Sequence, residues 1–213
     1  MKKKDYIILM ADIVGSSNND QKKLMGDFKN LTREINSDYK QDLLSPMTIT
    51  LGDEFQGVVK NVSAAIGLIF SIEEKIIQRN TGFKLRYVLF EGAIDTPINK
   101  EIAYGMLGDG LTKAREALEE IKGTNYRYYL NINNKKTGEA LRNSMFIYQS
   151  MIDDWNTGKD YDLITKFIEL KDYKEVAREL GKSRSQIWKR EKSLKIEEYF
   201  SIKSVISYLA ETV

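Results

Sequence analysis

Two aspartates stand at positions where a carboxylate could do chemistry. Asp12 follows the apolar run of residues 6–11, which is typical of a strand buried on both faces, and Asp53 lies in a Gly-Asp-Glu turn further along the chain. A carboxylate at the end of a buried strand is costly unless it is paired or binds a cation. Two such carboxylates on adjacent strands could converge on one or two Mg²⁺ ions and hold a triphosphate for in-line attack. Simpler interpretations stay open: Asp12 as a helix cap and Asp53 as an ordinary turn residue.

The composition narrows the chemistry that these carboxylates could do. The chain contains no Cys and no His. It therefore has no disulfides, no thiolate or imidazole metal site, and no Ser-His or Cys-His nucleophile pair. Any metal has to be held by oxygen, so we expect Mg²⁺ or Mn²⁺ and exclude haem, zinc and iron–sulfur clusters.

The pattern of apolar residues predicts a mixed α+β domain around the two aspartates. Strands are expected at 6–11, 47–51, 55–59, 84–94 and 126–132, and helices at 20–43, 63–78 and 111–121. This order predicts an α/β sandwich, with helices covering one face of a mainly antiparallel sheet. We place this domain at residues 1–157.

A helix over residues 137–155 is expected to close the first domain. Its apolar residues repeat at heptad spacing: Leu141, Met145, Tyr148, Ile152 and Trp155. Packing of this seam within the chain is the favoured interpretation. A linker to the next domain and a homodimer contact through this helix remain alternatives.

Residues 158–213 are predicted to form an all-α domain that contains a helix-turn-helix at 173–190. Ala177 is small enough to let two helices cross closely, and Gly181 can take the left-handed conformation that ends the first helix. Ser183 suits the N-cap of the second helix. An ordinary helical hairpin is the alternative.

The second helix of that motif would carry a concentrated positive charge. Residues 182–195 contain six Lys or Arg and one acidic residue, although the formal net charge of the whole chain is only +2. In this register five side chains would project toward the major groove of DNA: Arg184, Ser185, Trp188, Lys189 and Lys192. Lys182 and Arg190 depart from the usual pattern, which has aliphatic residues there. A solvated helix face is the alternative to a DNA-binding surface.

Several segments resemble known families. Residues 11–17 (Ala-Asp-Ile-Val-Gly-Ser-Ser) resemble the metal-binding first strand of class III nucleotide cyclases, and residues 51–55 (Leu-Gly-Asp-Glu-Phe) resemble their second metal-binding hairpin and the signature of diguanylate cyclases. With residues 45–57 and 108–118, these segments make the whole chain most similar to the SatD family of bacterial proteins. The resemblance implies a ferredoxin-like domain of the cyclase or palm type, with Asp12 and Asp53 as metal ligands. It implies nucleotide contacts at Gly15, Ser16, Gly52 and Arg115, with Arg115 as the catalytic arginine if the domain is active.

The chain departs from the cyclase pattern at two positions. Ile49 stands where purine cyclases have a Lys that contacts the base, and Leu111 stands where they have an Asn four residues before the arginine. The loss of such groups lowers rates by orders of magnitude. These departures favour a domain that binds a nucleotide or a divalent metal without efficient turnover.

Taken together, the motifs predict a DNA-binding transcriptional regulator of the SatD type whose palm-like domain binds a nucleotide or a metal. Two alternatives stay open: a Mg²⁺- or Mn²⁺-dependent nucleotidyl cyclase or transferase with an accessory helix-turn-helix domain, and a non-catalytic dimeric adaptor. The first apolar stretch is cut short by Asp12, and no window approaches the ~20 apolar residues of a membrane span. We therefore expect a cytoplasmic protein with no membrane partner.

Overall fold

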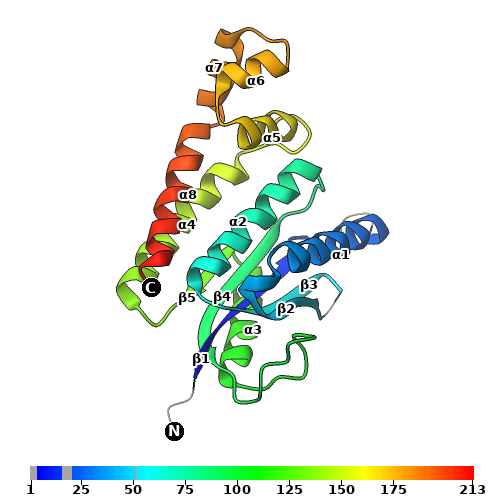
Figure 1. Cartoon of the computed structure of the whole chain (residues 1–213), viewed down its shortest axis with the longest axis vertical. Helices are drawn as coiled ribbons and strands as arrows, with labels where there is room; N and C mark the ends of the chain where they lie inside the picture. Colours follow the sequence, from blue (N-terminus) through cyan, green and yellow to red (C-terminus); the bar gives the residue numbers. More distant parts are fainter. Residues whose placement is uncertain (1–3, 16–20, 51) are drawn as a thin grey trace.

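The fold combines a mixed sheet with helices on both of its faces. The computed structural model describes residues 4–15, 21–50 and 52–213 (Figure 1). The strands are β1 (Asp5–Ile13), β2 (Leu43–Ile49), β3 (Glu54–Val59), β4 (Leu85–Ala93) and β5 (Tyr128–Asn131). The helices are α1 (Gln21–Asp38), the short 3-10 helix η2 (Lys40–Asp42), α2 (Val62–Arg79), α3 (Asp109–Lys122), α4 (Lys135–Asp153), α5 (Tyr161–Leu170), α6 (Tyr173–Glu179), α7 (Arg184–Ser193) and α8 (Ile196–Glu211).

Strand β1 lies at the centre of the sheet. Within the described residues the strand order is β2-β3-β1-β4-β5. The pairs β2–β3, β3–β1 and β1–β4 are antiparallel, and the pair β4–β5 is parallel. The central position explains why β1 is an unbroken apolar run, because both of its faces are covered. The predicted α+β class and mainly antiparallel sheet are therefore confirmed.

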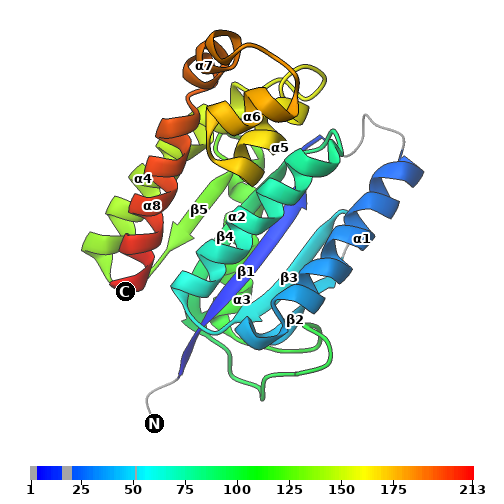
Figure 2. The same ribbon diagram turned by 45° about the horizontal axis from the view of Figure 1, so that its top comes forward.

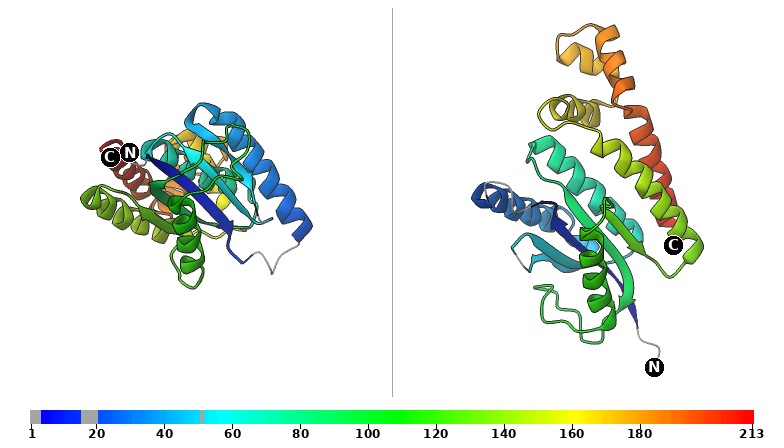
Figure 3. Two further views of the ribbon diagram at one scale, coloured as in Figure 1. Left: turned by 90° about the horizontal axis from the view of Figure 1, so that it is seen from below. Right: turned by 180° about the vertical axis from the view of Figure 1, so that it is seen from behind.

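The two faces of the sheet are covered by different helices. One face packs under α1 and α2 through residues such as Leu9 and Phe28, and the other packs under α3 through residues such as Met10 and Leu118. Figures 2 and 3 show α1 and α2 on the side of the sheet opposite to α3. The prediction that helices cover only one face is wrong, because the connection from β4 to α3 crosses the end of the sheet and places α3 behind it.

Helix α3 can start against β4 because glycines meet there. A Cβ added to Gly110 would lie 2.7 Å from the backbone carbon of Gly92, and one added to Gly108 would lie 2.5 Å from the carbonyl oxygen of Ala93. Real Cβ atoms do not approach backbone that closely, so the helix could not reach this position with larger residues. This close approach sets the position of every side chain that α3 presents to the sheet.

The C-terminal helices extend the hydrophobic core beyond the sheet. Helix α8 lies beside α4 and also contacts α2 (Figure 1). Tyr148 of α4 stacks on Tyr199 of α8 with ring centroids 5.8 Å apart, and Trp155 contacts Tyr199 at 5.0 Å. The indole Nε1 of Trp155 donates a hydrogen bond of 2.9 Å to the Leu194 carbonyl. Side chains from both sides of residue 157 thus share one core.

The heptad seam of α4 is buried inside the chain. Leu141, Met145 and Tyr148 are fully buried, and Ile152 and Trp155 are nearly so. Packing within the chain, the favoured interpretation, therefore describes this seam. The homodimer contact through this helix and the domain division at 157/158 remain untested predictions.

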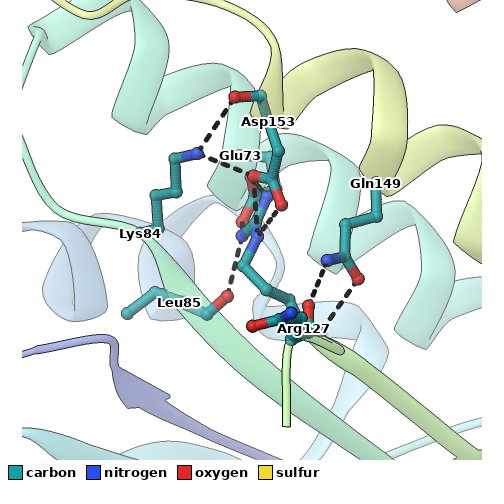
Figure 4. A network of polar contacts seen from close by, with 7 residues as sticks. Glu73, Lys84, Leu85, Arg127, Gln149 and Asp153 are labelled. Carbon is teal, nitrogen blue, oxygen red and sulfur yellow. Dashed lines mark hydrogen bonds and ion pairs between the residues drawn. The ribbon is translucent and has the colours of Figure 1, made fainter.

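A buried arginine ties the end of α4 to the sheet (Figure 4). The guanidinium of Arg127 forms paired hydrogen bonds of 3.0 and 3.1 Å to the Glu73 carboxylate of α2. Its Nε donates to Asp153 of α4 at 3.1 Å, and Lys84 donates to the same carboxylate at 2.8 Å. Gln149 accepts from the Arg127 backbone N–H at 2.8 Å. The side chain of Arg127, the residue before β5, thereby joins α2 and α4.

Local features of the predicted helix-turn-helix are present. Gly181 has φ +61°, and Ser183 caps α7 in a capping box with Gln186. Val176, Ala177 and Ile187 are buried, whereas Leu180 is 37% exposed. These local features do not establish a separate helix-turn-helix domain. The helices that flank α6 and α7 pack on α2 and α4.

Among the helices of the described residues, none is both long enough and apolar enough to cross a membrane.

Candidate functional site

Asp12 lies in a row of ionisable side chains that runs across three strands. Asp12 of β1 is the register partner of Glu54 on β3 and of Arg86 on β4. Residues directly opposite each other on neighbouring strands point to the same face, and this face is the one covered by α3. The row therefore carries two carboxylates and one guanidinium side by side beneath a helix.

Arg86 holds both oxygens of Asp12. Its Nε donates to Oδ1 at 3.0 Å and its Nη2 donates to Oδ2 at 3.0 Å. The side chains are 12% and 5% exposed, so this forked ion pair is largely buried. Lys122, at the end of α3, approaches Asp12 Oδ2 at 3.8 Å and also donates to Glu119 at 2.6 Å.

Glu54 is held by a different arginine. Arg115 of α3 donates from Nη1 to Glu54 Oε2 at 3.1 Å and from Nη2 to Glu54 Oε1. The Thr50 hydroxyl also donates to Oε1 at 3.2 Å. Arg115 and Lys122 are seven residues apart on α3, which places them two turns apart on one face of the helix. Helix α3 thus supplies a cation to each of the two buried carboxylates.

Asp53 lies next to Asp12 at the end of the sheet. The backbone N–H of Ile13, which follows Asp12, donates to the Asp53 carbonyl at 3.0 Å. Burial raises the pKa of the Asp12 carboxyl above its ordinary value, and the charge of Asp53 adds to this, whereas Arg86 and Lys122 lower it without cancelling the effect of burial. Ionised Asp12 is therefore incompletely compensated by the cations that surround it.

The glycines predicted to contact a nucleotide flank the same end of the sheet. Gly15 and Gly52 have φ values of +69° and +78°, a conformation that favours glycine, and a Cβ at either position would meet open space. Gly15 follows β1 and Gly52 precedes Asp53, so both turns lie beside the two aspartates. Ser16, the other predicted nucleotide contact, lies outside the described residues.

The donor set suits a hard divalent cation. Asp12 and Asp53 offer carboxylate oxygens at neighbouring strand ends, and Mg²⁺ typically takes one or two carboxylates and completes its shell with water and substrate phosphates. Among the residues that the structure describes, no three acidic side chains gather to hold a metal by themselves. Water and phosphate oxygens would therefore supply the remaining ligands.

Sequence reasoning missed Glu54, Arg86 and Lys122. Glu54 lies inside the Gly-Asp-Glu turn motif, and a hairpin turn alone explains a charged residue there. The sequence does mark Arg86 as a candidate site residue, because it is a charged residue inside a largely apolar strand. Its partner could not be known before the register of β1 and β4 was known. Lys122 gave no signal beyond its spacing from Arg115.

The side chains predicted to bind DNA belong to α7, which lies outside the sheet at the end of the molecule opposite the N-terminus (Figure 1). Arg184, Ser185, Trp188, Lys189 and Lys192 are all exposed. Lys192 is ion-paired with Glu197, and the neighbouring Arg190 is paired with Asp160. Acidic partners thus reduce the local positive charge on which the DNA-binding prediction rested.

Comparison with known proteins identifies the family. The sequence model of the SatD family matches residues 6–209, and the chain belongs to this family. The match runs through the C-terminal helices as well as the sheet. A search of curated protein sequences found no match.

Several solved structures of nucleotide cyclases resemble part of the chain. A bacterial light-regulated adenylyl cyclase aligns with a TM-score of 0.46 and 15% identity, over 63% of this chain and 45% of that one. Adenylyl cyclase CyaB from P. aeruginosa aligns with a TM-score of 0.41 and 13% identity, over 56% and 73%. Adenylate cyclases from Trypanosoma brucei align at 0.41 and 15%, over 52% and 65%. The chain thus spans less than half the length of the light-regulated enzyme.

The prediction of a DNA-binding regulator is wrong. The solved structures matched here are adenylyl and guanylyl cyclases and not DNA-binding regulators, and the family model that matches is that of SatD. The physical reason for the error is that capping, a left-handed glycine and a small residue at a helix crossing define any tight helical hairpin, whatever its function.

Proposed function

We propose that the chain binds a nucleoside triphosphate at the end of the sheet beside Asp12 and Asp53, and that it acts as a metal-dependent nucleotidyl cyclase or transferase. The observation that carries the proposal is the meeting of these two carboxylates at adjacent strand ends, next to Arg115 and Arg86. The ferredoxin-like order of the first four strands and the motifs shared with class III nucleotide cyclases support it.

Each group in this arrangement has a role that its chemistry allows. Asp12 and Asp53 would hold Mg²⁺ or Mn²⁺, which neutralises phosphate charge and activates the attacking hydroxyl. The turn at Gly15 gives the phosphates close access to the backbone, because glycine leaves the space beside it open. Arg115 would stabilise charge that develops on the phosphates during transfer.

The pocket for the base differs from that of the purine cyclases. Ile49 is half-buried at the end of β2 and offers no hydrogen bond to a base. Ile49 can make apolar contact with the ring of a base. It has no charged group with which to distinguish one purine from another. We therefore expect weak discrimination between ATP and GTP.

The test is incubation of the protein with Mn²⁺ and each of the four nucleoside triphosphates, followed by chromatographic analysis of the products. We expect a cyclic or transferred nucleotide product from the wild type and a loss of about 100-fold or more in Asp53→Asn. Asp162→Asn, an exposed aspartate on α5, is the matched control and should retain full activity. Equal activity in Asp53→Asn and the wild type would refute the proposal, as would the absence of both product and nucleotide binding.

A further inference from the structure

The Arg86–Asp12 ion pair occupies the atoms that a metal would need. Both Asp12 oxygens accept hydrogen bonds from Arg86, each at 3.0 Å. The fork takes the inner lone pair of each oxygen, which is where a cation bound by both oxygens would lie. Lys122 lies 3.8 Å from Oδ2 and adds positive charge beside the carboxylate. A divalent cation can therefore bind both oxygens of Asp12 only after Arg86 has moved away.

Arg86 needs a new partner if it leaves Asp12. Its side chain is only 12% exposed, and a buried guanidinium without a partner is strongly destabilising. Glu54, the other carboxylate of the row, is already bonded to Arg115 and Thr50 and is not available as a substitute partner. A phosphate group matches the geometry of the guanidinium fork as well as a carboxylate does.

We propose that Arg86 exchanges partners during binding: a nucleotide phosphate takes Arg86 while the divalent cation takes Asp12. The inference rests on the proposed function and adds a coupling between the two ligands. In the absence of nucleotide the ion pair competes with the metal for both oxygens of Asp12 and weakens metal binding. In the absence of metal, Asp12 competes with phosphate for Arg86. Each ligand thus removes the obstacle to the other, and the two bind with positive cooperativity.

The burial of Asp12 makes this exchange energetically reasonable. The Asp12 side chain is only 5% exposed, so its ionised carboxylate needs a cation beside it throughout the exchange. A divalent ion carries more charge than the guanidinium and would stabilise the ionised carboxylate further.

Binding of Mn²⁺ to the full chain, followed by the electron paramagnetic resonance signal of free Mn²⁺, tests the exchange. The wild type should bind Mn²⁺ weakly by itself and ~10-fold or more tightly with a non-hydrolysable ATP or GTP analogue present. Arg86→Gln frees Asp12 and should bind Mn²⁺ alone ~10-fold more tightly than the wild type, with little further gain from nucleotide. Arg178→Gln, on an exposed arginine of α6, is the matched control and should behave as the wild type.

The outcomes separate this inference from the proposed function. If Arg86→Gln binds Mn²⁺ no more tightly than the wild type, the exchange is refuted even where nucleotide binding is intact. If the wild type binds no nucleotide with or without Mn²⁺, the proposed function fails, while tight Mn²⁺ binding by Arg86→Gln still demonstrates the blocking ion pair. If Arg86→Gln does not fold by near-ultraviolet circular dichroism, Arg86→Lys carries the test, because it keeps the charge but loses the fork. Its Mn²⁺ affinity should lie above that of the wild type, and equal affinities would refute the exchange.

Discussion

Asp12 and Glu54 are register partners on neighbouring antiparallel strands, and each carboxylate is held by a different arginine. Two like charges directly opposite each other destabilise a sheet unless nearby cations compensate them. Arg86 supplies one cation from the next strand and Arg115 supplies the other from α3. The position of α3 therefore decides whether the row is compensated.

Gly110→Ala should displace α3 and disturb the row from a distance. The added Cβ would lie 2.7 Å from the backbone carbon of Gly92, so the helix has to move. We expect a loss of about 1–3 kcal/mol of stability, measured by urea unfolding. Gly123→Ala is the control, since its Cβ would meet nothing closer than 3.9 Å. Equal stabilities for Gly110→Ala and the wild type would show that the helix start is not tightly packed.

Arg115→Ala should lower kcat with a smaller effect on KM. If Arg115 stabilises developing charge, its loss costs about 100-fold in kcat. The measurement is steady-state kinetics with Mn²⁺ and the preferred triphosphate. Lys113→Ala, on an exposed position of the same helix, is the control. A change confined to KM would assign Arg115 to ground-state binding instead.

Glu73→Gln should be among the more destabilising single changes in the chain. Glu73 and Arg127 are both about 95% buried, with 4% and 5% exposed, and removing one charge of a buried pair costs about 3 kcal/mol. Chemical denaturation gives the value. Glu169→Gln, in an exposed pair with Lys166, should leave the unfolding midpoint unchanged. A small effect of Glu73→Gln would mean that Asp153 alone compensates Arg127.

Protonation of Asp153 should make the protein less stable in acid. Burial alone would raise the pKa of Asp153, but Arg127 and Lys84 outweigh it and hold the pKa below the ordinary value of 3.8. A carboxyl with a lowered pKa in the folded state stabilises it fully above the ordinary value, and this contribution is lost as the pH falls through the folded pKa. Asp153→Asn should be about 1–2 kcal/mol less stable than the wild type at neutral pH.

Urea unfolding at a series of pH values measures this dependence. The difference between the wild type and Asp153→Asn should narrow as the pH is lowered below 3.8. A difference that stays constant with pH would show that the lost stability comes from packing and not from the charge of Asp153.

Tyr199→Ala tests whether the sheet and the C-terminal helices unfold together. Tyr199 packs on Tyr148 and Trp155 from across the predicted boundary at 157/158, and its truncation should cost about 3–5 kcal/mol. In a Trp188→Phe background, Trp155 fluorescence and far-ultraviolet circular dichroism should report one coincident transition. Two separate transitions would instead support independent domains.

The sequence by itself determined the features that depend on near neighbours. The buried strand that ends at Asp12, the turn at Asp53, the heptad seam of α4 and the capping box at Ser183 follow from periodicity and turn chemistry within a few residues. The same local character misled the functional prediction, because a basic helical hairpin looks alike whether or not it binds DNA.

Only the tertiary structure decided which charges meet. Arg86 and Asp12 are 74 residues apart, and Arg115 and Glu54 are 61 apart. Their pairing depends on strand register and on the close approach of α3 to β4 at Gly92 and Gly110. A shift of one residue in register would turn these side chains to the opposite face, and no pattern within a short stretch of sequence specifies that register.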